Sequence, residues 1–338
     1  MIRERCDIAI SGGGIAGLTA AVAFGAAGFH TICVDPQPQV TEEADPASDL
    51  RTTALLGASV TLLEAIGLWP RLAPHAAALR IMRIVDAGGP TASPRRILDF
   101  DAAEILDRPF GYNIPNWLLR REILAHLAGL PQVELRSGVG VAHVLTREGE
   151  ALVTLSDGNR LAAPLLVAAD GRDSPVREAL GTTSRTWRYG QKALAFAVSH
   201  PIPHHDISTE IHRSGGPFTL VPLPDRGGRP ASAVIWMERG PEVLRLAALP
   251  PDEFETAMTA RSGAILGPLG LITERRVWPI ITRVAARMTG ERTALMAEAA
   301  HVVPPIGAQG LNMSLADLAV LRDLAVTAPG TIGSPAML

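Results

Sequence analysis

A glycine pattern near the N-terminus constrains what this sequence can fold into more than any other feature. A short apolar run with β character leads into a G-x-G-x-x-G pattern, an Ala-rich helical stretch follows, and a second apolar run ends in an acid. These parts are residues 6–10, Gly12, Gly14 and Gly17, residues 15–27, residues 31–34 and Asp35. Strand, glycine turn, helix, strand and terminal acid are the components of a dinucleotide-binding βαβ unit. The sequence therefore predicts a Rossmann-like α/β domain at the start of the chain.

Each glycine of the pattern has a separate physical task. Gly12 permits a tight turn, Gly14 lets the backbone approach a pyrophosphate, and Gly17 lets helix and strand pack closely. The helix N-terminus then presents free N–H groups and a partial positive charge to the phosphates. Asp35 is placed to accept a hydrogen bond from a ribose hydroxyl.

Two other interpretations of this stretch are a signal peptide and a membrane span. Arg3 and Arg5 followed by apolar residues suggest the first, and the high apolar content suggests the second. Five glycines between Ser11 and Gly28 interrupt any apolar core, and Asp7 lies inside it. The chain has no uninterrupted apolar run of the roughly 18 residues that a membrane span needs. The nucleotide-binding interpretation is therefore preferred.

The amino-acid composition limits which partners this protein can bind and in which cellular compartment it is expected. The 338-residue chain has a net charge of −3 and 19% charged residues, so no strongly basic face and no nucleic-acid partner are expected. Hydrophobic residues make up 47%, and the mean hydropathy is +0.20, which fits an apolar pocket or contact with a membrane surface. Cys6 and Cys33, the two cysteines, fall on neighbouring buried strands, as suits inert thiols in a reducing cytosol.

A cluster of histidines resembles part of a metal site, but the sequence offers no further ligands for it. His200, His204 and His205 with Asp206 resemble metal ligands. They fall among prolines in an expected loop, with no second cluster elsewhere to finish a coordination shell. We therefore expect no bound metal.

The rest of the chain first alternates strands and helices and then becomes rich in strands. Arg51 follows a polar loop (36–50) and precedes a helical pattern (55–66); such an Arg is usually a solvated charge, but it could also reach back to the pyrophosphate. Between residues 187 and 283, strand-like pieces alternate with Pro- and Gly-rich turns, which predicts a second, inserted domain. Strands are expected at 79–85, 96–100, 165–169 and 294–297, a Gly/Pro/Ser loop at 87–94, a β-meander at 133–155, and helices at 117–127, 252–265 and 313–326.

Three motifs in this order resemble the flavin-dependent aromatic hydroxylases that share the p-hydroxybenzoate hydroxylase fold. They are GGGIAG at 12–17, AADGRDSPVR at 168–177 and ALMAEAAHVVPPIGAQGLNMSLAD at 294–317. The resemblance covers essentially the whole chain. The third motif, with TEIHRSGGPFTLVPLP at 209–224, is most similar to the branch that hydroxylates ubiquinone precursors.

This resemblance implies an α/β fold with two domains. One is a Rossmann-like FAD-binding domain, similar to that of glutathione reductase and with a β-meander, and the other is an inserted sheet-rich substrate domain. The implied boundaries are 1–78, 100–182 and 276–338 for the FAD-binding domain and 79–99 and 183–275 for the substrate domain.

The resemblance also implies roles for individual residues. Asp170 and Gly171 match the family's Asp-Gly pair near the pyrophosphate, which in this fold also serves the nicotinamide cofactor. The turn from Gly307 would lie against the isoalloxazine ring, where N–H groups at a helix start would stabilise the negative charge of reduced flavin. The residues implied to bind FAD are Gly12, Gly14, Gly17, Asp35, Arg51, Arg120, Asp170, Gly171, Glu298, Gly310, Leu311 and Asn312, and the catalytic positions are Pro304, Pro305 and Gly307.

The strand around residue 220 is expected to line an apolar substrate pocket. Period-2 spacing puts Phe218 and Leu220 on one side of that strand. With Pro304 and Pro305 over the flavin, these side chains would enclose the substrate. Ordinary sheet core is the alternative interpretation for both.

The implied activity is that of an FAD-dependent aromatic monooxygenase. It would use NAD(P)H and O₂ to hydroxylate a lipophilic phenol, a ubiquinone precursor, through a flavin C4a-hydroperoxide, so no Ser-His-Asp or paired-carboxylate constellation is required. One alternative is another FAD oxidoreductase or a halogenase, although Lys192, the only lysine, lies outside the three motifs. The other is a binding or scaffold subunit of a quinone-making complex with weak or no catalysis. The expected location is cytoplasmic, with peripheral contact to the inner face of the membrane as an option.

The chain departs from the family pattern at two places. The family's Gly-Asp is Ala297-Glu298 here, and the extra Cβ and methylene are expected to weaken FAD binding by crowding. Ser334 and Pro335 are typical of a helix start, yet only three residues follow. Because one turn cannot sustain a helix, we expect a missing continuation, an exposed apolar patch and self-association.

Overall fold

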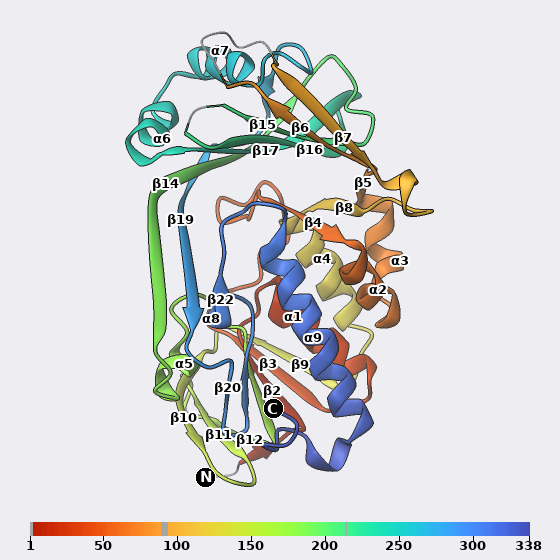
Figure 1. Cartoon of the computed structure of the whole chain (residues 1–338). Coiled ribbons are helices and arrows are strands. Elements are labelled where there is room, and N and C mark those ends of the chain that lie inside the picture. Colours follow the sequence, from red (N-terminus) through yellow and green to blue (C-terminus); the bar gives the residue numbers. More distant parts are fainter. Residues whose placement is uncertain (1–2, 89–93, 214) are drawn as a thin grey trace.

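The computed structural model describes residues 3–88, 94–213 and 215–338. Figure 1 shows a large sheet with two helices above it and, below it, a parallel sheet flanked by helices. Two long strands on one side, β14 (Ser184–Ser199) and β19 (Arg276–Ala285), run between the upper and lower parts. The described α-helices are α1 (Ile15–Ala26), α2 (Gly57–Ala65), α3 (Trp69–Leu72), α4 (Asn116–Leu127), α5 (Pro175–Ala179), α6 (Gly240–Ala247), α7 (Pro251–Arg261), α8 (Ala297–Ala300) and α9 (Gln309–Thr327). Short 3₁₀ turns are η1 (Ala73–His75), η2 (Ala102–Glu104) and η3 (Pro329–Thr331).

The lower part is built on a largely parallel sheet. Its strands, in spatial order, are β20 (Thr289–Gly290), β21 (Thr293–Leu295), β13 (Leu165–Ala168), β2 (Ile8–Ser11), β3 (Thr31–Asp35) and β9 (Val133–Ser137). Every residue of β2 and β13 is buried, because helices and other strands cover both faces, and this explains the continuous apolar runs in the sequence. Burial raises the pKa of the thiols of Cys6 and Cys33 to about 12, so neither is ionised at neutral pH.

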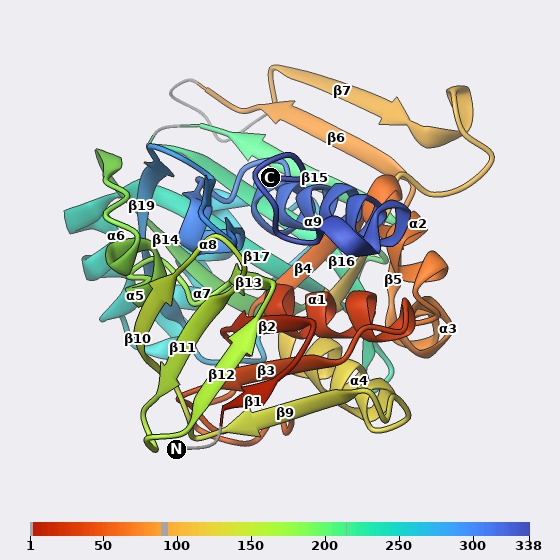
Figure 2. The same ribbon diagram turned by 90° about the horizontal axis from the view of Figure 1, so that it is seen from below.

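A mixed sheet, antiparallel except for β1, lies against one side of the parallel sheet, and Figure 2 shows it from below. Its strands, in order, are β1 (Glu4–Arg5), β12 (Arg160–Ala163), β11 (Ala151–Leu155) and β10 (Val141–Thr146). The predicted meander is therefore right from residue 141 onward. It is wrong for β9, which pairs in parallel with β3 after the crossover through α4.

The upper sheet contains nine of the described strands. Its main path runs through β22 (His301–Val302), β19, β14, β17 (Arg229–Arg239), β16 (Pro217–Arg226), β15 (Ile207–His212), β6 (Ile81–Asp86) and β7 (Arg96–Asp101), and β18 (Gly270–Leu271) pairs with β14. Helices α6 and α7 cover the outer face of this sheet (Figure 1). The α/β class predicted from the sequence is confirmed.

A small sheet between the two parts corrects the prediction around Arg51. Its strands are β4 (Thr52–Leu56), β8 (Gly111–Pro115) and β5 (Ala77–Leu79). Residues 52–56 pair with β8 instead of starting a helix, because pairing outweighs the helical period of the short run. Helix α9 begins at Gln309 rather than at Met313, and α7 ends at Arg261 rather than at Ile265.

The boundaries of the two domains stay a prediction. In the predicted joining loop at 87–94, residues 89–93 lie outside the described residues. At the C-terminus, Leu338 N–H donates to Ser334 O in one turn, and the side chains of Met337 and Leu338 pack against the core of the lower part. These two side chains are partly buried. The expected apolar patch and self-association stay predictions.

Candidate functional site

The turn before α1 has the geometry that the glycine pattern predicts. Gly12 has φ +107°, and a Cβ there would lie 2.3 Å from Ala169 O. A Cβ on Gly17 would lie 1.9 Å from Gly12 O, so helix and turn touch at this point. At Gly14, the N-cap of α1, an added Cβ would meet no described atom within 4 Å. Gly12 and Gly17 are thus needed by the protein itself, whereas the space beside Gly14 is open for a ligand.

Asp35 and Arg120 meet at this turn. Asp35 Oδ2 accepts a hydrogen bond from Gly13 N, and Oδ1 accepts one from Gln37 N at 2.7 Å. Arg120 Nη1 donates to Gly13 O at 3.3 Å and to Gln39 Oε1 at 2.7 Å. The structure therefore places both predicted cofactor residues beside the first turn, each held by the backbone of that turn.

The second motif returns the chain to the same turn. Asp170 follows β13, and its Oδ2 accepts hydrogen bonds from Ser11 Oγ at 3.3 Å and from Val176 N at 3.2 Å. Its Oδ1 is buried without a partner among the described residues. Burial raises the pKa of Asp170, and the hydrogen bonds that it accepts offset this only in part. Gly171, the next residue, has φ +86° and open space around its Cα.

Arg51 is fixed by two neighbours that its sequence context did not reveal. Its guanidinium donates to both carboxylate oxygens of Asp49 at 2.8 and 2.7 Å and lies 4.2 Å from the ring centroid of Trp278. Burial acts to lower the pKa of Arg51, but Asp49 and the charge of Glu298 raise it overall. Arg51 is therefore an anchored ion-pair partner, with 37% of its side chain still exposed, and its contact with the pyrophosphate stays a prediction.

Ala297 and Glu298 stand where the resembling family has Gly-Asp. Ala297 has φ +53°, a left-handed conformation that costs a residue with a Cβ about 1–2 kcal/mol. Glu298 accepts hydrogen bonds from Arg172 Nε at 3.1 Å and from Nη2 at 3.3 Å. Strain at Ala297 and an ion pair at Glu298 thus replace the simple crowding expected from the sequence.

The third motif ends in the start of α9. Gly307 has φ +64°, and Ala308, the N-cap, has φ +54° and no side-chain cap among the described residues. The N–H groups of the first turn, which includes Gly310 and Leu311, therefore have no partner within the helix. Pro304 and Pro305 precede this turn, half-buried and exposed respectively.

Asn312 holds this turn in place. Its Oδ1 accepts hydrogen bonds from Leu56 N at 2.8 Å and from Ser59 Oγ at 2.6 Å. Its Nδ2 donates to Ala54 O and to Ala308 O at 2.7 and 2.6 Å. The side chain, predicted to contact FAD, is fully used inside the protein, so any contribution to the cofactor comes through the position of the helix.

Phe218 and Leu220 lie on the face of the upper sheet away from the parallel sheet. Both are buried, and they pack with Trp236 and Phe254 in the core beneath α6 and α7. The expected substrate-pocket role does not fit this placement; the alternative, sheet core, does. Phe218 and Leu220 do share one side of β16, as a period of 2 predicts, but such a period carries no information about which face of the sheet the helices cover.

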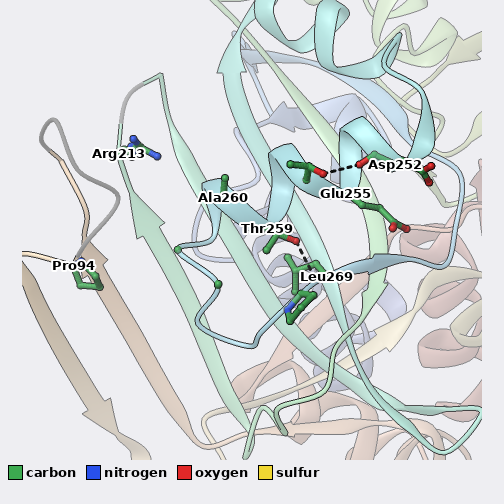
Figure 3. Close-up of a pocket in the computed structure, with 11 residues that line it drawn as sticks. Pro94, Arg213, Asp252, Glu255, Thr259, Ala260 and Leu269 are labelled. Atoms are coloured by element: carbon green, nitrogen blue, oxygen red, sulfur yellow. Dashed lines mark hydrogen bonds between the residues drawn. The ribbon is translucent and has the colours of Figure 1, made fainter.

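Two hollows differ in their relation to these residues. The larger, on the outer face of α7, is an open depression bordered by Asp252, Glu255 and Leu269 (Figure 3). It lies across the upper sheet from the turns that precede α1 and α9, at residues 11–17 and 296–312, which we call the glycine turns. A smaller cavity of about 120 Å³ lies between the inner face of the upper sheet and the ends of β4 and β8. The apolar residues that line it include Leu50, Pro115, Trp117, Leu118, Ala197, Leu223 and Pro224.

The residues at the glycine turns fit FAD. Helices α1 and α9 both begin without a side-chain cap among the described residues, so both present N–H groups suited to anionic parts of a cofactor. The open space at Gly14 and the unpartnered Oδ1 of Asp170 leave room and an acceptor between them. When bound, FAD would supply the oxygen chemistry that this chain has no side chains to perform.

Sequence reasoning missed Asp49, Trp278 and Arg172. Asp49 lies two residues before Arg51, so its pairing could have been suspected. Trp278 lies far along the chain in β19, and no local pattern connects it to Arg51. Arg172 lies inside the second motif, but its ion-pair partner Glu298 lies far along the chain in the third motif.

Three comparisons agree with this geometry. A family model described as FAD binding domain matches residues 5–333. Ubiquinone hydroxylase UbiL of Rhodospirillum rubrum is 35% identical over 336 residues, which cover 98% of this chain and 76% of that protein. 3-Demethoxyubiquinol 3-hydroxylase of Escherichia coli is 25% identical over 338 residues, covering 97% and 81%.

Solved structures show the same fold. PqsL of Pseudomonas aeruginosa, in complex with 2-aminobenzoylacetate, superposes with a TM-score of 0.79 at 22% identity, covering 97% of this chain and 88% of that chain. p-Nitrophenol 4-monooxygenase PnpA of Pseudomonas putida gives a TM-score of 0.77 at 21% identity, covering 97% and 82%. The chain therefore belongs to the FAD binding domain family and is an FAD-dependent monooxygenase of the branch that contains the ubiquinone hydroxylases.

Proposed function

We propose that this protein hydroxylates the aromatic ring of a lipophilic phenol, a ubiquinone precursor, with NAD(P)H as reductant and O₂ as co-substrate. The observation that carries the proposal is the similarity to ubiquinone hydroxylase UbiL over 98% of the chain. The apolar part of the lining of the cavity between β4, β8 and the upper sheet supports a lipophilic ring; the lining also includes Glu43, His75, Asp225 and Arg226.

The residues around the glycine turns have proposed roles in holding FAD. The N–H groups at the start of α1 bind the pyrophosphate beside Gly14, and Asp35 accepts from the adenosine ribose. Asp170 and Gly171 lie at the pyrophosphate end, and Arg51 adds positive charge. At the other end, the first turn of α9 stabilises negative charge on the reduced ring.

Pro304, Pro305 and Gly307 are proposed to shape the wall beside the reacting carbon and to exclude water. None of the three has an ionisable side chain, so they act by position only. Tight exclusion of water favours transfer of oxygen to the ring over loss of the oxidant to solvent.

The cavity near Leu223 is the proposed substrate site, in place of the surroundings of Phe218 and Leu220. Leu223 and Ala197 belong to the inner face of the sheet, and Trp117 and Pro115 close the opposite side. At the rim, Arg226 is ion-paired with Glu43, which connects the sheet to the loop after β3. Opening this pair would widen the entrance for a substrate larger than the cavity itself.

A cytoplasmic location with peripheral contact to a membrane or to a quinone-biosynthesis complex is part of the proposal. A lipophilic precursor is concentrated in the bilayer, so an enzyme that uses it gains from surface contact. Among the described residues, no helix has both the length and the hydrophobicity of a membrane span.

A second candidate is a flavin-fold binding subunit with weak catalysis. The strained Ala297 and the ion pair that engages Glu298 favour it, because both oppose an undisturbed ribityl site. The two candidates differ in turnover: the subunit would retain lipophilic phenols without oxidising NAD(P)H.

The test combines a spectrum with a substrate titration. Purified protein should show flavin absorbance, and a prenylated phenol should stimulate NAD(P)H oxidation and yield a product that is heavier by one oxygen. Leu223→Trp should raise the phenol concentration for half-maximal stimulation by about ten-fold or more, with FAD binding unchanged. Phe218→Leu, on the helix-covered face, is the matched control and should lower stability without shifting that concentration. Protein that stays colourless with added FAD would falsify the cofactor role, and a preference for small hydroxybenzoates would contradict the lipophilic substrate.

A further inference from the structure

Strand β7 is an unprotected sheet edge. It pairs with β6 on one side, and among the described residues no strand lies on its other side. Figure 2 shows the β6–β7 hairpin at the rim of the molecule, away from the helices. Its apolar side chains are exposed on both faces, with 49% of Ile97, 41% of Leu98 and 56% of Phe100 accessible.

The free edge of β7 presents a defined set of backbone groups. Ala102 N–H donates to Arg80 O, and the Cα partners continue in register from Ile81–Asp101 to Asp86–Arg96. Because hydrogen-bonded pairs alternate in an antiparallel ladder, every second residue of β7 counted from Ala102 faces β6. Ile97, Asp99 and Asp101 therefore direct their N–H and C=O groups outward.

Natural proteins usually protect such an edge with proline, charged side chains (lysine above all), a bulge or a covering element. The sequence of β7, RILDFD, has neither proline nor lysine, its charged residues are Arg96, Asp99 and Asp101, and its pairing with β6 has no register shift. Its central charge, on Asp99, is matched by Arg83 of β6 through two hydrogen bonds of 2.8 and 2.7 Å. The charge therefore does not repel an incoming strand as a free carboxylate would.

We propose that β7 binds β7 of a second copy of this chain in antiparallel register, joining the two upper sheets into one. With Leu98 opposite Leu98 across a two-fold axis, Ile97 lies opposite Asp99 and Arg95 lies opposite Asp101. The outward groups then form about six backbone hydrogen bonds, because the N–H of Arg95 already donates to Asp86 O within each hairpin. In one copy the side chain of Arg95 donates to Gly88 O and that of Asp101 accepts from Ala103 N; across the two copies their opposite charges meet at both ends of the ribbon, which favours a second copy over an unrelated partner.

The side chains support this register on the other face as well. Leu98 neighbours Ile84 within each hairpin, so the dimer has a continuous apolar row of Ile84, Leu98 and their two symmetry mates. Arg96 comes opposite Phe100, where a cation–π contact stabilises the pair. Shifting the axis to Asp99 would bring two aspartates together and remove the Arg95–Asp101 match, so that register is disfavoured.

Sedimentation and disulfide trapping test the proposal on the full chain with FAD. Leu98→Cys should form a disulfide-linked dimer on mild oxidation, because Cα atoms of a directly opposed, non-hydrogen-bonded pair lie about 4.5 Å apart, within disulfide reach. The native Cys6 and Cys33 are buried and should not react. Ile97→Cys and Asp99→Cys are matched controls on the same exposed strand; in this register their symmetry mates are too distant to bridge. Leu98→Lys should weaken the unmodified dimer at least ten-fold in sedimentation equilibrium.

Three outcomes would overturn the proposal. The first is a monomer at every concentration, with no disulfide in Leu98→Cys. The second is efficient bridging in Asp99→Cys but not in Leu98→Cys, which would show another register. The third is a monomer that binds vesicles of phosphatidylethanolamine and phosphatidylglycerol and loses this binding in Leu98→Lys, which would make the strand a lipid contact instead.

Discussion

The two turns proposed to hold the flavin are built on opposite principles. In the turn at residues 11–17, the positive-φ position is a glycine and every close approach is made by a residue without a Cβ. In the turn at residues 296–312, two positive-φ positions are Ala297 and Ala308, and the carboxylate of Glu298 is engaged by Arg172. The first turn is unstrained, whereas the second is held in a strained form by its surroundings.

This difference in backbone strain shows which contacts determine the conformation of each turn. The first turn is determined locally, since Gly12 and Gly17 allow only one close packing of strand and helix. The second is determined by a distant contact: Asn312 joins it to β4 and α2 through three hydrogen bonds, and a fourth goes to Ala308 in the turn itself. Strained backbone persists where its surroundings over-determine it.

Gly17→Ala should break the first turn and have the largest effect. A Cβ only 1.9 Å from Gly12 O forces strand and helix apart, so we expect a loss of roughly 3 kcal/mol or more in the free energy of unfolding, or no folded protein. Gly14→Ala is the control, since its Cβ enters open space. Gly14→Ala should fold with nearly unchanged stability toward urea but should lose FAD retention. Normal FAD retention in this variant would show that the pyrophosphate is not bound in the space beside Gly14.

Asn312→Ala should loosen the second turn. It leaves the N–H of Leu56 and the C=O of Ala54 without their partner, so urea unfolding should show a loss of roughly 2–4 kcal/mol. FAD retention should fall in parallel, because the first turn of α9 loses its position. Gln309→Ala, which removes an exposed hydrogen bond in the same turn, should change stability by less than about 0.5 kcal/mol. Equal effects of the two substitutions would show that Asn312 does not anchor the turn.

The same contrast explains what could be predicted from sequence. The parallel sheet, α1 and the first turn follow from local rules, because glycine spacing and apolar runs are read along the chain. The position of β9 and the strand β4 could not be predicted, since each is fixed by a partner far away in sequence.

The proposed site divides in the same way. Gly12, Asp35, Arg120 and Asp170 are found around one turn, as the motifs predict. The anchoring of Arg51 by Trp278 could not be predicted, because 227 positions separate them and no pattern joins them. The side of the sheet faced by Phe218 depends on which face α6 and α7 cover, and a period of 2 carries no such information.

Ala297→Gly should relieve the second turn. Glycine adopts φ +53° without a Cβ penalty, so the free energy of unfolding should rise by about 1 kcal/mol, less the entropy that glycine adds to the unfolded chain. Adding Glu298→Asp shortens the carboxylate that Arg172 now binds, and the double variant should bind FAD more tightly in a titration of the apoprotein. Ala308→Gly, at φ +54°, is the matched control for strain alone and should stabilise without the same gain in FAD affinity. Unchanged affinity in the double variant would show that the ribityl site has adapted to Glu298.

The smallest effect concerns the charge of Asp170. Burial raises its pKa in the folded protein, so the folded state holds this proton more tightly than the unfolded state. Stability therefore falls as the pH rises from the unfolded pKa through the folded one, and the loss is complete above both. Asp170→Asn removes this charge and should raise the stability of the apoprotein at pH 7 by at most about 1 kcal/mol, with a smaller gain at pH 4.

Asp157, an exposed turn residue whose pKa is lowered by hydrogen bonds from Asn159, is the control with the opposite sign. Asp157→Asn should lower the stability at pH 7, and the loss should become smaller as the pH falls. Urea unfolding of the three apoproteins at both pH values measures the difference. If Asp170→Asn instead loses stability at pH 7, the carboxylate is stabilised by its hydrogen bonds rather than penalised by burial, and its unpartnered oxygen carries no cost for FAD to remove.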